Sequence, residues 1–142
     1  MNFPDINRSI LQELTTEQWS NRNVKVYVKR DDLIHEEISG NKWRKLMYNV
    51  ELAKNNKNDT LITFGGAFSN HLVATACACS VFGLKSIGIV RGDELSENSN
   101  DTLKRCADYG MQLEFVSREL YNLRYDKDWW RELQLDYPNA MV

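Results

Sequence analysis

The sequence predicts an α/β protein in which helices cover both faces of a parallel sheet, a three-layer arrangement. Short apolar runs alternate with segments of helical character, the alternation typical of parallel strands joined by right-handed crossovers. Glycines follow two of the helical segments, at Gly83 and Gly110, where a left-handed helix end is expected. The 142 residues are 42% hydrophobic and 27% charged, ordinary proportions for a globular domain.

The first part of the chain predicts one strand and one helix. Residues 1–23 have mixed polarity, and we expect them to form a peripheral lead-in. Residues 24–30 alternate apolar and polar side chains, which predicts a strand with one buried face. Residues 39–41 then interrupt the pattern and offer helix-capping side chains. A helix follows, because a single apolar stripe runs along Trp43, Leu46, Met47, Val50 and Ala53 until the turn-forming residues 55–59.

The remainder of the chain predicts the sheet and its covering helices. We expect parallel strands at residues 60–64, 86–90 and 112–116, helices at 70–82, 100–109 and about 127–136, and a further strand near the end of the chain. The helix at residues 70–82 is apolar almost all round, so neighbouring elements should cover it on more than one side.

Composition disfavours several functional classes. A formal net charge of -2 with interspersed signs argues against nucleic-acid or membrane-surface binding. The sequence shows neither a signal-peptide pattern nor an apolar run long enough to span a bilayer, so we expect a cytoplasmic protein. Cys77 and Cys79 should point to different faces of one helix, and Cys106 stands apart. With two histidines in the chain, we predict buried thiols and no metal site.

The first candidate site is the start of the helix after Gly40. Lys42 falls in the first turn, and Lys45 follows one turn later on the same face. An amine at a helix N-terminus lies at the positive end of the helix dipole, which favours its neutral, nucleophilic form. Lys45 and free backbone N–H groups suit a phosphate. By spacing alone, however, the preferred interpretation is that Lys42, Arg44 and Lys45 form the solvated face of an amphipathic helix.

The second candidate site is the glycine turn between residues 64 and 71. Ligands of parallel sheets bind at the carboxyl ends of strands, and Gly65 and Gly66 allow a close approach of the backbone. Ser69 and Asn70 offer a hydroxyl and an amide there, although ordinary helix capping explains them equally well. The turn matches neither the dinucleotide-binding nor the Walker A pattern. A Ser69–His71 nucleophile lacks both an acid placed by sequence and the nucleophile-elbow context.

Taken together, three ordered runs carry a family resemblance. They are Lys29-Arg30-Asp31-Asp32-Leu33, Gly40-Asn41-Lys42-x-Arg44-Lys45-Leu46 and Gly65-Gly66-x-x-Ser69-Asn70-His71. In this order and spacing they resemble the 1-aminocyclopropane-1-carboxylate deaminase/D-cysteine desulfhydrase family, which belongs to the tryptophan-synthase-β-like, fold-type II, pyridoxal-phosphate (PLP) enzymes. Three motifs at family-like spacing are more specific than any one of them, and they reverse the preference for a merely solvated Lys42.

The resemblance implies a role for each candidate residue. Lys42 would form the Schiff base with pyridoxal 5'-phosphate and move a substrate proton. Lys45 would contact the cofactor phosphate, and Asn70 would hydrogen-bond the phenolic oxygen of the cofactor. Ser69 would act in catalysis by meeting the substrate carboxylate, in a substrate-binding loop that also contains Asn70 and His71.

The resemblance also implies a domain plan. Residues 1–56 would be the N-terminal segment of a large cofactor domain, and residues 57–142 a small parallel α/β domain. Family members are about twice as long, so the C-terminal remainder of the large domain is absent from this chain, either as a fragment or as a natural truncation.

The implied activity is that of the intact protein. It is deamination or β-elimination of a small amino acid of the 1-aminocyclopropane-1-carboxylate or D-cysteine type, by a lyase or hydrolase that assembles as a homodimer. The present chain alone is expected to be inactive. The alternative is a non-catalytic, truncated α/β module that acts through association with another chain.

Overall fold

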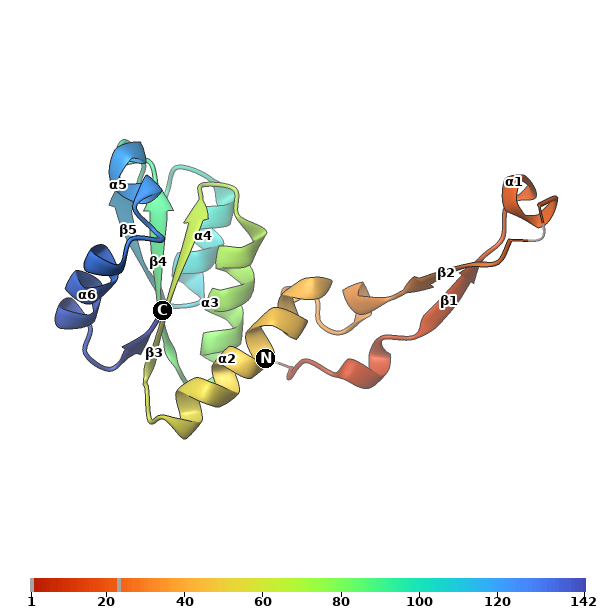
Figure 1. Cartoon of the computed structure of the whole chain (residues 1–142), viewed down its shortest axis with the longest axis horizontal. Helices are drawn as coiled ribbons and strands as arrows, with labels where there is room; N and C mark the ends of the chain where they lie inside the picture. The colour runs from red at the N-terminus through yellow and green to blue at the C-terminus, as the bar shows by residue number, and fades with distance from the viewer. Residues whose placement is uncertain (1, 23) are drawn as a thin grey trace.

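The computed structural model describes residues 2–22 and 24–142 and shows an α/β body from which a long arm projects (Figure 1). The sheet of the body has the strand order β5-β4-β3-β6, and each neighbouring pair is parallel. Its strands are β3 (Thr60–Gly66), β4 (Lys85–Arg91), β5 (Met111–Val116) and β6 (Ala140–Met141). The predicted three-layer parallel sheet is confirmed, including the further strand expected near the end of the chain.

Helices cover both faces of this sheet (Figure 1). On one face lie α2 (Asn41–Asn55), α3 (Asn70–Phe82) and α4 (Asp101–Asp108), and on the other lies α6 (Lys127–Asp136), preceded by the short α5 (Arg118–Asn122). Successive residues of a strand point to opposite faces. Leu61 therefore packs with α2 and α3, while Ile62 packs against Trp129 and Leu133 of α6.

The helix predicted at residues 70–82 is α3, and its all-round burial is confirmed. Residues 72–79 are all buried, between the sheet, α2 and α4. The two thiols of α3 lie on different faces, as predicted. Cys77 packs with Ile34 and Ile38 before α2, and Cys79 packs with Val50 and Ala53 of α2. Gly83 and Gly110, with φ values of 71° and 83°, have the predicted left-handed conformation.

All three cysteines are free and buried, as predicted. Burial raises the pKa of Cys79 to about 12 and that of Cys106 to about 11, since the apolar surroundings disfavour a thiolate. Within the described residues, none of the helices is both long and apolar enough to cross a membrane.

The arm is an antiparallel ribbon of β1 (Leu11–Leu14) and β2 (Val26–Lys29), with α1 (Glu17–Ser20) at its tip. Two 3₁₀ turns, η1 (Ile6–Arg8) and η2 (Asp31–Leu33), lie at its base. The strand predicted at residues 24–30 is confirmed, but the prediction that one of its faces is buried is wrong. Val24 and Val28 of that face are exposed, because the described residues supply no second layer over this ribbon.

The lead-in of residues 1–23 is peripheral, as expected, although residues 1 and 23 lie outside the described residues. It pairs with β2 through β1 and returns to the body through backbone contacts. The Asp5 N–H, for example, donates to the Ile34 carbonyl at 3.1 Å.

Candidate active site

The start of α2 is built on a glycine turn. Gly40, the N-cap residue, has φ 61° and ψ −140°, a conformation that side chains with a Cβ rarely adopt. Among the described residues, no side chain makes a capping hydrogen bond here, so the capping expected from Ser39 and Asn41 is wrong. Lys42 falls in the first turn, as predicted. Its side chain is half-buried and Nζ donates to Asn41 Oδ1 at 3.1 Å.

The start of α3 is built on the second glycine turn. Ser69 is the N-cap, and its Oγ accepts the Leu72 N–H at 3.4 Å. A Cβ at Gly65 would lie 2.6 Å from Leu72 Cγ and 2.9 Å from Ser69 Cβ, so Gly65 is needed for the packing of α3 on β3. A Cβ at Gly66 would meet nothing within 4 Å, which leaves this backbone accessible to a ligand.

A polar hollow of about 260 Å³ joins the two helix starts. We name it the Lys42 hollow. It is lined by Glu36, Glu37, Ser39, Lys42, Asn70, Val73 and Arg105. Arg105 of α4 forms an ion pair with Glu37 at its margin. The structure thus brings Lys42 and Asn70, from separate predicted motifs, to the same hollow.

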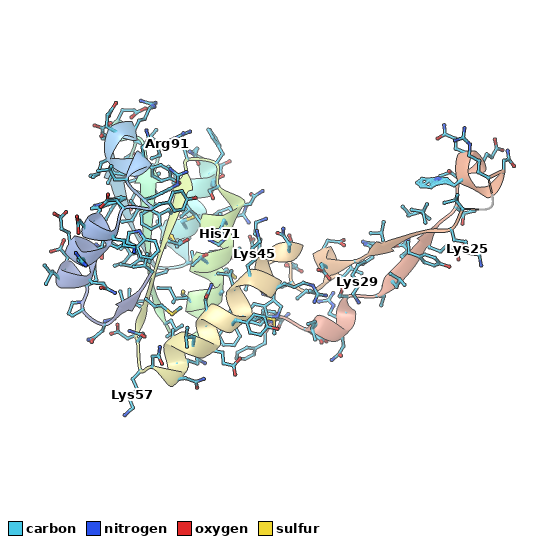
Figure 2. The ribbon with its side chains drawn as sticks, viewed as in Figure 1. Lys25, Lys29, Lys45, Lys57, His71 and Arg91 are labelled. Atoms are coloured by element: carbon cyan, nitrogen blue, oxygen red, sulfur yellow. The ribbon has the colours of Figure 1, made fainter. Side chains whose placement is uncertain are left out.

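His71 lies between the two helices and the sheet. Its ring is half-buried, and Nε2 is 3.0 Å from the Thr63 Oγ1 of β3. Burial lowers the pKa of His71, and the positive charges of Lys42 and Lys45 lower it further, so the imidazole is neutral near pH 7. Both lysines therefore lie near enough to His71 for their charge to act on it; Figure 2 shows Lys45 near His71.

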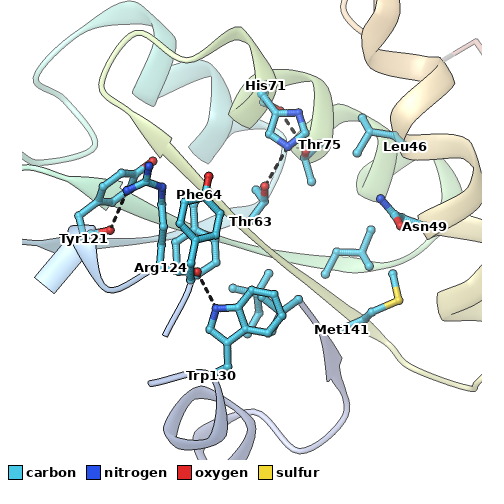
Figure 3. Close-up of a pocket in the computed structure, with 14 residues that line it drawn as sticks. Leu46, Asn49, Thr63, Phe64, His71, Thr75, Tyr121, Arg124, Trp130 and Met141 are labelled. Atoms are coloured by element: carbon cyan, nitrogen blue, oxygen red, sulfur yellow. Dashed lines mark hydrogen bonds between the residues drawn. The ribbon is translucent and has the colours of Figure 1, made fainter. Parts of the chain in front are cut away.

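A second hollow of about 370 Å³ lies along the edge of β3 (Figure 3). We name it the β3-edge hollow. It is lined by Leu46, Asn49, Leu61, Ile62, Thr63, Phe64, His71, Thr75, Tyr121, Arg124, Tyr125, Trp130, Met141 and Val142. The Arg124 guanidinium lies over the rings of Tyr121 and Tyr125, at 5.1 and 4.5 Å from their centroids. The indole Nε1 of Trp130 donates to the Arg124 carbonyl at 2.6 Å.

Sequence reasoning missed this second hollow. Three of its aromatic residues follow β5: Tyr121 lies in α5, which was not predicted, Tyr125 lies in the turn before α6, and Trp130 lies in α6. The one available signal was the density of aromatic side chains between residues 121 and 130. The hollow itself depends on tertiary pairing, because β6 pairs with β3 only at Thr60 and Leu61.

The five predicted site residues therefore divide between four positions. Lys42 and Asn70 line the Lys42 hollow, and His71 lines the β3-edge hollow. Ser69 caps α3, and Lys45 is exposed on α2 near His71. All five lie at the starts of α2 and α3, but they do not share a single cavity.

A parallel sheet whose carboxyl-end glycine turn meets a lysine-bearing helix start is suited to holding an anionic carbonyl cofactor. Residues 8–140 match the family described as "Pyridoxal-phosphate dependent enzyme". Since the match spans nearly the whole chain and includes both helix starts, the protein belongs to this family of cofactor enzymes.

Relatives within the family confirm the finer resemblance. The chain is 47% identical over 72 residues to a "Putative 1-aminocyclopropane-1-carboxylate deaminase" of Pyrococcus abyssi, a match that covers 51% of this chain and 22% of the relative. It is 44% identical over 70 residues to the "Bifunctional D-cysteine desulfhydrase/1-aminocyclopropane-1-carboxylate deaminase, mitochondrial" of Arabidopsis thaliana, covering 49% of this chain and 18% of the relative.

The fold has a matching relative among solved structures. A protein described as an "ACC deaminase homologue" aligns with a TM-score of 0.68 and 29% identity, over 94% of this chain and 42% of that one. The chain thus spans less than half the length of each of these three relatives.

The cofactor of the family is pyridoxal phosphate, and two donors of the Lys42 hollow, Lys42 and Asn70, fit its aldehyde and phenolic groups. Glu36 and Glu37 also line the hollow, and Glu37 is paired with Arg105. A primary amine at Lys42 faces the same space as the Asn70 amide, the Ser39 hydroxyl and the Arg105 guanidinium. An amine suits an aldehyde carbon, and the amide suits a phenolic oxygen.

Proposed function

We propose that the intact protein is a PLP-dependent deaminase or β-eliminating lyase that acts on a small amino acid of the 1-aminocyclopropane-1-carboxylate or D-cysteine type. The observation that carries the proposal is that Lys42 and Asn70, on two different helices, line one polar hollow. The names of the relatives support the substrate class.

Each candidate residue has a proposed task in this reaction. Lys42 holds the cofactor through its amine and moves a proton at the α-carbon of the substrate. Bound pyridoxal phosphate supplies the electron sink for that carbon. Lys45, exposed one turn further along α2, contributes positive charge for the phosphate. Asn70 donates its amide to the phenolic oxygen of the cofactor.

The Ser69–His71 loop has the proposed task of binding the substrate. The Ser69 hydroxyl, which accepts the Leu72 N–H, is left with its own proton to donate to a carboxylate. A neutral His71 takes part in this loop without adding a third positive charge beside Lys42 and Lys45. Its contact with Thr63 orients the ring.

The wider setting is also part of the proposal. Residues 1–56 belong to a large cofactor domain and residues 57–142 to a small domain, in a homodimeric cytoplasmic enzyme. The exposed apolar side chains of the arm support the existence of a further domain, because Leu11 and Tyr27, 64% and 45% exposed, are suited to packing against one.

The direct test of the proposal is to identify the lysine that carries the cofactor. Borohydride reduction of the full-length protein with pyridoxal phosphate should fix the label on Lys42, and Lys42→Ala should abolish both the label and ammonia release from D-cysteine. Lys57→Ala, at the far end of α2, is the control and should keep both. Labelling of Lys45 or Lys29 in place of Lys42 would contradict the assignment.

A second test separates Asn70 from Ser69. Asn70→Ala should shift the absorbance of the bound cofactor and weaken its binding, with a smaller effect on substrate affinity. Ser69→Ala should weaken substrate binding more, and should also cost about 1 kcal/mol of folding stability because the α3 cap is lost. Identical effects of both changes on cofactor and substrate would indicate loss of helix capping alone.

The alternative function is a non-catalytic module that binds another chain, favoured by the exposed apolar arm. For the 142-residue chain alone, we expect weak cofactor binding, no turnover and self-association. Stoichiometric binding confined to Lys42, with turnover of D-cysteine by this chain alone, would contradict that expectation.

A further inference from the structure

We propose that Asp31 is the positioning residue for Lys42: it fixes both the turn at Gly40 and the rotation of α2, and thereby directs the Lys42 amine into the Lys42 hollow. The inference rests on the proposed function of Lys42 and deepens it. Asp31 itself does not line that hollow.

The carboxylate of Asp31 binds two segments that are distant from it in sequence. Arg44 of α2 donates twice, from Nε to Oδ2 at 2.5 Å and from Nη2 to Oδ1 at 2.9 Å. Ser9, at the base of the arm, donates its hydroxyl to Oδ1 at 2.5 Å. A two-point contact between a guanidinium and a carboxylate fixes orientation as well as distance. Both charges are partly buried, with the Asp31 side chain 18% exposed.

The backbone of Asp31 closes the loop that leads to Lys42. Its carbonyl oxygen accepts the Gly40 N–H at 3.1 Å and the Ile34 N–H at 3.3 Å. The same residue therefore fixes the glycine turn through its carbonyl and the helix after that turn through its carboxylate. Lys42 follows the turn by two residues and precedes Arg44 by two.

Helix geometry connects the ion pair to the direction of Lys42. Residues two apart in a helix project in directions about 200° apart. When Arg44 is held against Asp31, Lys42 must therefore project to the other side of α2, where the Lys42 hollow lies. The buried Trp43 and Leu46 would still hold α2 on α3 after loss of the pair, but the turn at Gly40 and the first turn of α2 would lose their shared anchor, and with it the fixed direction of the Lys42 side chain.

The neighbouring carboxylate lacks this connection. Asp32 pairs with Arg30, and both belong to the exposed base of the arm. Arg44 and Ser9 hold the pKa of Asp31 well below its ordinary value, so its carboxylate stays charged across the neutral range. Asp32→Asn is therefore a matched control: it makes the same chemical change one residue away, without touching Gly40 or Arg44.

The first experiment measures hydrogen exchange of the Gly40 amide in the full-length protein. It compares the wild type with the variants Asp31→Asn, Asp31→Glu and Asp32→Asn. We expect Asp31→Asn to speed exchange about tenfold at residues 34–44 while leaving residues 72–79 unchanged. Asp31→Glu should restore part of the protection, and Asp32→Asn should match the wild type. The proposal would be overturned if Asp31→Asn sped exchange uniformly throughout the body, or if it left the exchange rate of the Gly40 amide unchanged.

The second experiment measures the yield of borohydride-fixed pyridoxal phosphate at Lys42 as a function of pH. Asp31→Asn should lower the yield at Lys42 about tenfold and move label to other lysines, because an amine displaced by about 1 Å loses most of its advantage. If Asp31→Asn fails to fold, Arg44→Lys takes its place. This change keeps the charge but loses the two-point contact, and it should lower the yield at Lys42 in the same way. An unchanged yield and pH profile in a folded Asp31→Asn would refute the inference.

The two proposals fail in different ways. If wild-type Lys42 takes no label, the proposed function fails, while exchange at Gly40 still tests the link between Asp31 and the turn. If wild-type Lys42 is labelled and Asp31→Asn equals Asp32→Asn in both measurements, the positioning role alone fails.

Discussion

The helix α3 and the arm differ most in how far their apolar side chains are buried. In α3, residues 72–79 are all buried, and the sheet, α2 and α4 surround them. In the arm, Val24 and Val28 are exposed, although the alternation of residues 24–30 is typical of a strand with one buried face. An apolar pattern thus specifies the local backbone in both regions, but burial requires a second layer, which the described residues provide only for the body.

The reactivity of thiols should separate the two regions most strongly. Cys77, Cys79 and Cys106 are buried, and burial raises the pKa of each, so alkylation at pH 8 requires local opening. A cysteine introduced as Leu11→Cys in the arm should react about a thousandfold faster than these three. Mass spectrometry of the alkylated peptides measures the ratio, and comparable rates would show that the body opens as readily as the arm.

Removal of apolar volume should have the next largest effect. Leu72→Ala should lower the free energy of unfolding by about 3 kcal/mol, because Leu72 is fully buried against Val90 and Leu103. Leu11→Ala, at a side chain 64% exposed, should change it by less than about 0.5 kcal/mol. Urea unfolding of both variants measures the two changes. Equal losses of unfolding free energy would show that the arm and α3 do not differ in this respect.

A smaller effect is expected from adding a methyl group beneath α3. Gly65→Ala should cost about 1–3 kcal/mol, since the new Cβ would come within 2.6 Å of Leu72 Cγ. Gly66→Ala is the control, because its Cβ would meet nothing within 4 Å and should change stability by no more than about 0.5 kcal/mol. Similar melting temperatures for the two variants would show that α3 shifts without cost.

The smallest effect concerns the pH dependence of stability through His71. Its pKa is lowered in the folded state by burial and by Lys42 and Lys45, so the unfolded chain binds this proton at higher pH than the folded protein does. The free energy of unfolding therefore rises with pH through the window below the ordinary histidine pKa of about 6.5, and this contribution is lost on acidification. His71→Gln should reduce that slope between pH 5 and 7; denaturant midpoints measure it, and an unchanged slope would count against a neutral His71.

The elements of the body could be predicted because their signals are local. The bounds of α3 and α6 match the predicted ranges of 70–82 and about 127–136, since apolar patterning agrees there with a clear stop signal, Gly83 after α3 and Pro138 after α6. The candidate site was predicted at the same level: Lys42 lies in the first turn of α2, and Ser69 caps α3. The chemical roles of both residues remain proposals.

The arm pairing and the β3-edge hollow could not be predicted in this way. The pairing of Leu11 with Lys29 joins residues whose partnership leaves no local trace, and Arg124 meets β3 only after α5 turns the chain back. Likewise, the sequence shows Asp31 and Arg44 as separate charges thirteen positions apart, and folding makes them one ion pair.

Local pattern, through side-chain periodicity and the backbone freedom of glycine, was enough to specify the strands, the helices and the two helix starts that carry the candidate residues. The tertiary structure alone decided which of these residues share a hollow, because Lys42 and Asn70 meet only when α2 packs on α3. Short-range sterics and hydrogen bonds act within a few residues, whereas burial and ion pairing depend on contacts that exist only once the layers have assembled.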